Sequence, residues 1–278
     1  MDYFFQGFSS FYEVLWVFLI YAFFGWCSEV AYAALNTGKF VNRGFLNGPV
    51  CPIYGCGIVI VVSILTPLKE NLIILFFGSL ILTTLLELVV GWGMEVLFHN
   101  QWWDYSDEHF NFKGYICLKF SILWGLACTF VMDIIHPIIV KPIRLLPIKI
   151  GIVLLVILFG IFITDCIITV SNILKFNKKL LLLEEIQSQL DKISNEIGEN
   201  IYEGVSEAIE VSDKVKENVM EKREELANHY QDILEERAKY QERILKAFPT
   251  LKSKRHKDAL EIIKKTREDL HSKLSIKK

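Results

Sequence analysis

Charged side chains are scarce in the first 171 residues, which make up more than half of the chain. This part holds 8 of the 30 Lys and Arg residues and 11 of the 32 Asp and Glu residues, whereas residues 172–278 hold the other 22 and 21. The chain therefore consists of two parts of different composition, which meet near Ser171.

Several catalytic and metal-binding motifs are absent. There is no GxxxxGKS or GxxxxGKT phosphate loop, so the chain is not itself a P-loop ATPase. The lack of a GxSxG elbow argues against a Ser-His-Asp hydrolase. Its six cysteines show no CxxC spacing, and we expect them to pack as small apolar side chains. The sequence predicts no catalytic residue, metal or cofactor.

What the first part does contain is long apolar runs. A transmembrane helix needs about 20 apolar residues, because each residue adds about 1.5 Å along the axis. The first run is expected to be retained, because acidic Asp2, Glu13 and Glu29 are atypical of a signal peptide. We therefore predict an all-α, multi-pass protein of the cell membrane with about five transmembrane helices, over residues 11–35, 49–66, 71–98, 115–140 and 148–171.

The first four runs contain an internal repeat at an offset of 66 residues. The string GWCSEV at 25–30 aligns with GWGMEV at 91–96, and GPVC at 48–51 aligns with GYIC at 114–117. Each repeat would be a helix, a polar and aromatic segment, and a second helix. The sequence thus predicts a parallel two-helix repeat plus one further helix.

Acidic residues lie inside the apolar runs, where an ionised carboxylate costs about 2.5–3.5 kcal/mol at the bilayer centre. Glu87 falls near the middle of its run, so it must face a partner, a cavity or a pathway. Glu29 and Glu95 lie nearer the ends and could instead reach the interface. Asp133 and Asp165 are the other acids within these runs.

The polar segments between the paired helices supply further candidates. Arg43 is placed either to pair with Glu29 or Glu95, or to anchor at lipid phosphates. Aromatic residues at 102, 103 and 105 could form an interfacial belt. Loop residues His99, Asp104, Asp107, Glu108 and His109 could ligate a metal, but no ligand spacing repeats and we predict no metal site. The candidate substrate or pathway residues are Glu29, Glu87, Glu95, Arg43, Trp26, Trp92, Asn42, Asp104 and Tyr105.

The strings FVNRGFLNGPVCPIYGCG, GWCSEVAY and WWDYS resemble a bacterial membrane family named "Putative ABC-transporter type IV", over residues 12–137. The resemblance implies a multi-span permease component with a separate ATPase partner. It implies no catalytic residues. The positions that match the family's motifs are Trp26, Glu29, Asn42, Arg43, Gly44, Gly48, Pro49, Cys51, Pro52, Tyr54, Gly55, Glu87, Trp102, Trp103, Asp104 and Tyr105.

Residues 172–278 form a charged tail with helical periodicity. Apolar side chains recur at steps of three and four, which predicts either a coiled coil or a folded-back hairpin, and a homo-oligomer or a partner bound through the tail. Gly198, Gly204 and Pro249 are expected to divide it into two or three helices. The balanced charge argues against nucleic-acid binding. The periodic positions are Leu183, Ile186, Leu190, Ile193, Ile197, Leu226, Tyr230, Ile233, Tyr240 and Ile244.

These observations favour a permease subunit that moves a substrate past intramembrane carboxylates. An interfacial membrane enzyme using Asp104 or Glu29 with Arg43, and a scaffold that recruits a partner through its tail, are the alternatives. If the tail is cytoplasmic, six basic residues near the spans lie inside and four lie outside, which the positive-inside rule favours.

Overall fold

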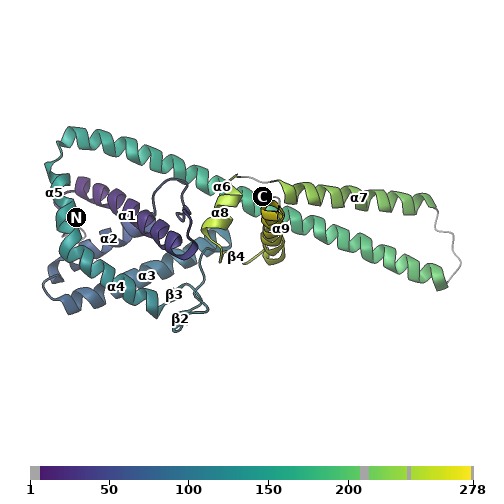
Figure 1. Ribbon diagram of the computed structural model, residues 1–278, viewed down its shortest axis with the longest axis horizontal. Coiled ribbons are helices and arrows are strands. Elements are labelled where there is room, and N and C mark those ends of the chain that lie inside the picture. Colours follow the sequence, from purple (N-terminus) through teal and green to yellow (C-terminus); the bar gives the residue numbers. More distant parts are fainter. Residues whose placement is uncertain (1–6, 207–212, 237–238, 277–278) are drawn as a thin grey trace. The chain divides into compact units, whose positions relative to one another are not determined.

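The structure is a computed structural model that describes residues 7–206, 213–236 and 239–276, and it is 78% helical (Figure 1). In this part of the chain four helices are long and apolar enough to cross a membrane, namely Phe11–Thr37, Leu72–Phe98, Leu118–Leu145 and Ile148–Asn195. The sequence predicts five. The second predicted span is instead a shorter apolar helix, Pro52–Leu68.

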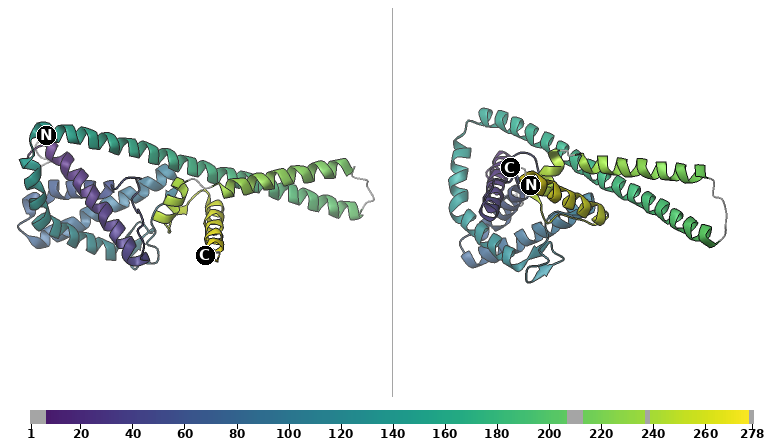
Figure 2. Two further views of the ribbon diagram at one scale, coloured as in Figure 1. Left: turned by 45° about the horizontal axis from the view of Figure 1, so that its top comes forward. Right: turned by 45° about the vertical axis from the view of Figure 1, so that its right-hand side comes forward.

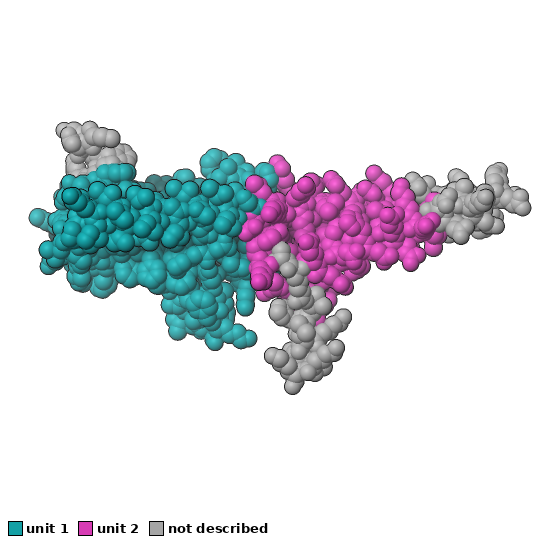
Figure 3. Space-filling model, turned by 90° about the horizontal axis from the view of Figure 1, so that it is seen from above, with its two compact units in different colours: residues 1–171, 243–252 teal, residues 172–242, 253–278 magenta. Residues whose placement is uncertain are grey.

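Contacts divide the chain into two compact units (Figure 3). Unit 1 contains Met1–Ser171 and Arg243–Lys252, and unit 2 contains Asn172–Glu242 and Ser253–Lys278. Residues 243–252, which the sequence assigns to the tail, therefore pack in unit 1.

Unit 1 begins with α1 (Phe11–Thr37) and α2 (Pro52–Leu65), joined by residues 38–51, which we call loop 1. The side chain of Ser10 accepts a hydrogen bond from the Glu13 amide and so caps α1. The helix ends at Gly38, whose φ of 67° is the left-handed conformation that glycine adopts without strain. Proline at the first position of α2 needs no amide partner there.

A 3-10 turn, η1 (Thr66–Leu68), leads to α3 (Leu72–Phe98), which is capped by the side chain of Asn71. Loop 2, residues 99–117, follows. It contains β1 (Asn100–Gln101) and an antiparallel pair, β2 (Asn111–Phe112) and β3 (Ile116–Cys117). Both repeats thus have the predicted order of helix, loop and helix.

The last part of unit 1 runs through α4 (Leu118–Phe130), a π-helical turn η2 (Val131–Ile135) and α5 (His136–Leu145) into α6 (Ile148–Ser206). The boundary between the units falls inside α6, after Ser171. The apolar core of unit 1 joins side chains from several of these helices, including Val17, Val61, Leu75 and Met132.

Helices α1 and α2 approach closely because small residues face large ones. A side chain at Gly25 would overlap the Tyr54 ring, and a Cβ at Gly55 would lie 2.5 Å from the Phe18 carbonyl oxygen. Helix backbones can approach to this distance only where Cβ is absent, as in other membrane helix pairs. This approach places Tyr54 against α1.

Unit 2 contains the second part of α6 together with α7 (Asp213–Glu235), and α9 (Lys257–Ile276). The two views of Figure 2 show α7 running back alongside α6. Lys179 Nζ donates to the Glu236 carbonyl oxygen at 2.7 Å, which supports the folded-back hairpin. A coiled coil stays a prediction.

The predicted breaks in the tail are partly wrong. The α6 helix continues through Gly198 and Gly204, since an isolated glycine costs a helix only about 1 kcal/mol. Pro249 does follow a helix end, because α8 (Lys239–Ala247) stops two residues before it and β4 (Lys252–Ser253) comes after it. The side chain of Ile197, one of the periodic positions, lies outside the described residues.

Candidate functional site: a carboxylate and tyrosine cluster

The first part of the site joins α1 to α2. The hydroxyl of Tyr54 donates to Glu29 Oε1 at 2.6 Å. Gly25 leaves the space that the Tyr54 ring occupies, and Trp124 of α4 meets that ring edge-on with centroids 5.4 Å apart. Glu29 is therefore held by a neutral donor inside unit 1.

Loop 1 brings a cation to the same carboxylate. Arg43 Nε lies 3.5 Å from Glu29 Oε2, and the guanidinium carbon lies 5.3 Å from the centre of the Tyr32 ring. Of the partners that the sequence suggests for Arg43, the structure shows Glu29. An ion pair with both side chains about one-quarter exposed contributes modestly to stability, because water still solvates it.

Asn42 organises loop 1 and does not reach the carboxylates itself. Its Oδ1 accepts from Trp26 Nε1 at 2.7 Å and from the Gly44 amide at 3.2 Å, while its Nδ2 donates to the Asn47 carbonyl at 2.8 Å. These bonds tie loop 1 to α1 and fix the turn that carries Arg43.

The second part of the site joins α3 to loop 2. Glu87 is 8% exposed, and its Oε1 accepts from the Tyr105 hydroxyl at 3.2 Å. Glu87 Oε2 has no hydrogen-bond partner among the described residues. Burial, and then the charge of Glu87, raise the pKa of Tyr105, so its hydroxyl keeps its proton and remains a donor. The Tyr105 ring stacks on Phe120 with centroids 4.8 Å apart.

The two parts are close enough to interact electrostatically. The charge of Glu29 acts on both Glu87 and Tyr105. We call Glu29, Tyr54, Glu87 and Tyr105 the carboxylate–tyrosine cluster. Each repeat contributes one acid from its first helix, and tyrosine hydroxyls donate to both acids.

Other predicted site residues lie elsewhere. Glu95 accepts from the Tyr115 hydroxyl at 2.6 Å, and burial, followed by this carboxylate, raises the pKa of Tyr115 to about 12. The Trp92 side chain is 59% exposed. Asp133 is also exposed, within the π-helical turn η2.

Asp104 does not face the cluster as a free acid. It accepts hydrogen bonds from the Ser106 amide and hydroxyl, at 3.0 and 2.5 Å, and forms an ion pair with Lys252. Burial disfavours its charge, but the bonds from Lys252 and Ser106 outweigh burial and lower the pKa of Asp104. The belt predicted for loop 2 does not include Trp102, which is 3% exposed and enclosed by protein.

Sequence reasoning missed the roles of two other acids. Asp165 of α6 accepts from the Asn47 amide at 3.2 Å, the Asn47 side chain at 2.8 Å and the Gly48 amide at 2.7 Å. Glu13, 2% exposed, accepts two hydrogen bonds from Arg144 of α5, at 2.9 and 3.0 Å. Their partners lie about 120 and 131 residues away in the sequence, so no local pattern marks them.

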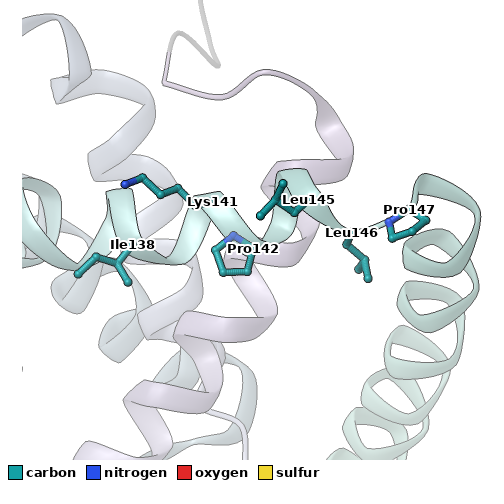
Figure 4. A pocket seen from close by; sticks show the side chains of 6 residues that line it. All are labelled: Ile138, Lys141, Pro142, Leu145, Leu146 and Pro147. Carbon is teal, nitrogen blue, oxygen red and sulfur yellow. The ribbon is translucent and has the colours of Figure 1, made fainter.

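A surface pocket lies at the turn between α5 and α6, and none of the acids described above lines it (Figure 4). Its lining is apolar apart from Lys141, and includes Leu145 and Pro147. Among the described residues no group of three or more His, Cys, Asp or Glu side chains could hold a metal ion.

Long apolar helices with buried, partnered acids define a multi-pass helical membrane protein. The family model "Putative ABC-transporter type IV" matches residues 16–170, more than half of the chain, and the protein belongs to this family. No curated protein and no solved structure matches the chain. Family membership suggests a separate ATPase partner.

Proposed function

We propose that the protein is a permease subunit whose polar pathway passes the carboxylate–tyrosine cluster. The observation that carries this proposal is Glu87, a nearly buried acid inside an apolar helix with one carboxylate oxygen that lacks a partner among the described residues. An acid in that position is costly, so it is retained where a pathway or a substrate uses it. The substrate itself stays open.

The loops supply the partners of the two acids. Arg43 of loop 1 lies at Glu29, and Tyr105 of loop 2 lies at Glu87. A movement of either loop would change the charge or the hydrogen bonding that a passing substrate meets. The enzyme alternative gains less support, because its candidate groups Asp104 and Arg43 are engaged by Lys252 and Glu29.

We further propose that residues 1–171 form the transmembrane domain in the plasma membrane and that residues 172–278 form a cytoplasmic tail. The basic residues near the spans support this orientation, six against four. The separate ATPase that family membership suggests would then act from the tail side.

The proposal predicts that water reaches position 87. In a cysteine-free background, Glu87→Cys and Val89→Cys would be reconstituted in lipid vesicles and treated with a trimethylammonium methanethiosulfonate reagent. Val89 is the matched control, because it lies on the same helix and is 60% exposed, where lipid would cover it. We expect Glu87→Cys to react at least about tenfold faster, because hydrocarbon excludes a charged reagent.

Equal reaction rates at the two positions would contradict a polar pathway at Glu87. Far-ultraviolet circular dichroism and size-exclusion chromatography of both variants would show whether each remains folded. Tyr105→Phe, which removes the donor but keeps the ring, would be tested in the same background. We expect labelling at position 87 to stay fast, because phenylalanine is no larger than tyrosine and does not fill the space beside position 87.

A further inference from the structure

Residues 243–252 form a short segment of the C-terminal region that packs within unit 1, and we call it the strap. Most of its apolar side chains are buried, with Ile244, Leu245 and Leu251 each at most 3% exposed. Neighbouring residues on both sides, up to Glu242 and from Ser253, belong to unit 2. The strap thus belongs to the tail in sequence but packs with unit 1, which contains loops 1 and 2.

At loop 1 the strap contributes a guanidinium. Arg243 donates to the carbonyl oxygens of Gly44, Phe45 and Leu46, each at 3.0 Å. Carbonyl oxygens in a loop need hydrogen-bond donors, and the planar fork of arginine offers several at once. Burial lowers the pKa of Arg243, which nearby Asp165 opposes, and arginine stays charged.

The same loop is held on its other side by an anion. Asp165 accepts from the amides of Asn47 and Gly48, the two residues that follow the carbonyls bound by Arg243. Loop 1 therefore lies between a cation that binds its carbonyls and a carboxylate that binds its amides. Removing Arg243 leaves one of these two attachments.

At loop 2 the strap contributes a ring and an ammonium group. Phe248 meets Trp102 edge-on with centroids 5.1 Å apart, and Trp102 meets Phe45 of loop 1 at 5.0 Å. Lys252 forms an ion pair with Asp104. One segment of ten residues thus binds both loops, and Trp102 connects them.

We propose that the strap is a regulatory contact through which the C-terminal helices control the carboxylate–tyrosine cluster. Each loop that the strap binds carries the partner of one cluster acid, Arg43 for Glu29 and Tyr105 for Glu87. A change in the tail acts on the strap through the covalent chain at both of its ends. The binding of the loops stands independently, whereas its effect on the pathway rests on the proposed function.

Hydrogen exchange of the full chain in detergent, followed by mass spectrometry, tests the binding of the loops. With Arg243→Ala we expect amides of residues 40–51 and 100–115 to exchange about tenfold faster, because several charge-assisted hydrogen bonds are lost. Arg243→Lys should give a smaller increase, since an ammonium group cannot span the three carbonyls. Lys246→Ala, an exposed cation of the same helix, is the matched control and should leave both loops unchanged.

A charge exchange tests the second attachment without removing a side chain. Lys252→Asp and Asp104→Lys should each speed exchange in loop 2, and the double variant should restore slow exchange. If the double variant did not recover slow exchange, or if Arg243→Ala left exchange unchanged, the claim that the strap binds both loops would be wrong.

The regulatory effect has a separate readout. The labelling rate of Glu87→Cys should change at least about threefold when Arg243→Ala is added, if the released loops no longer hold their partners at the cluster. Faster loop exchange with an unchanged labelling rate would keep the strap as a structural contact and overturn its control of the cluster. If position 87 does not react in either background, the proposed pathway is wrong. The hydrogen-exchange result still tests whether the strap binds the loops.

Discussion

The acids of unit 1 differ in the groups that compensate their charge. Glu13 receives two hydrogen bonds from a guanidinium, and Asp165 receives them from two amides and an amide side chain. Glu29 has a tyrosine hydroxyl and a more distant cation, whereas the structure gives Glu87 a tyrosine hydroxyl alone among the described residues. Glu13 and Asp165 are thus held by several protein donors, whereas one oxygen of Glu87 lacks a hydrogen-bond partner among the described residues.

The Glu13 and Arg144 pair should behave as a structural contact. Arg144→Met leaves the carboxylate of Glu13 buried and unpaired, so we expect a loss of about 3 kcal/mol in the free energy of unfolding. The double variant with Glu13→Gln should recover most of this loss, because no buried charge remains. Unfolding in mixed detergent micelles would measure both.

Lys149→Met provides the control for that cycle, because it removes an exposed cation near Arg144 in sequence. Its effect on the free energy of unfolding should stay within about 0.5 kcal/mol. A double variant no more stable than Arg144→Met would contradict the view that the unpaired acid causes the loss.

At the scale of elements, the contact between α1 and α2 positions Tyr54 at Glu29. The two helices approach where glycine faces an aromatic ring or a backbone carbonyl. In the second repeat Glu95, which aligns with Glu29, accepts from Tyr115 of loop 2, and Tyr105 of the same loop donates to Glu87. The two halves therefore reach a similar arrangement of acid and hydroxyl by different segments.

Gly55→Ala should separate α1 from α2. Its new Cβ would lie 2.5 Å from the Phe18 carbonyl oxygen, which cannot move without moving the helix. We expect a loss of about 1–3 kcal/mol in the free energy of unfolding from the overpacked contact. Gly93→Ala is the matched control on α3, since no atom lies within 4 Å of its added Cβ, and it should be neutral or stabilising. Equal effects of the two variants would refute the close approach.

For the whole molecule, contact between the loops constrains how the chain crosses the membrane. Phe45 of loop 1 and Trp102 of loop 2 have ring centroids 5.0 Å apart, so both loops must lie on one side. The α3 helix ends at loop 2 and α2 begins at loop 1, so the turn between them must lie on the other side if α3 crosses. The shorter helix Pro52–Leu68 would then cross as well.

Cysteine labelling in intact cells with a membrane-impermeant maleimide tests this topology. Lys39→Cys and His109→Cys, one in each loop, should be labelled from the same side, and Glu70→Cys, in the turn after η1, from the opposite side. All three positions are exposed, which makes them comparable. Labelling of position 70 from the side of position 39 would show that α2 does not cross.

Long apolar runs and scarce charge were sufficient to predict the helical membrane architecture, because the bilayer imposes length and composition on each helix. The 66-residue repeat likewise predicted the shared order of helix, loop and helix. Glu29, Arg43, Glu87 and Tyr105 could be chosen from the sequence because ionisable and polar residues in or beside apolar runs stand out locally. The resemblance to the family was carried by short strings within the first part.

Only the tertiary structure shows which of these residues contact one another. Glu29 contacts Tyr54 and Arg43, whereas Glu95, its equivalent in the aligned strings GWCSEV and GWGMEV, accepts from Tyr115. Glu87 accepts from Tyr105, and Trp92 is exposed. It also decided that Arg243, 199 residues from Gly44, binds loop 1. Periodicity reports which face of a helix is apolar, but contacts between distant segments depend on how the whole chain packs, which no local pattern contains.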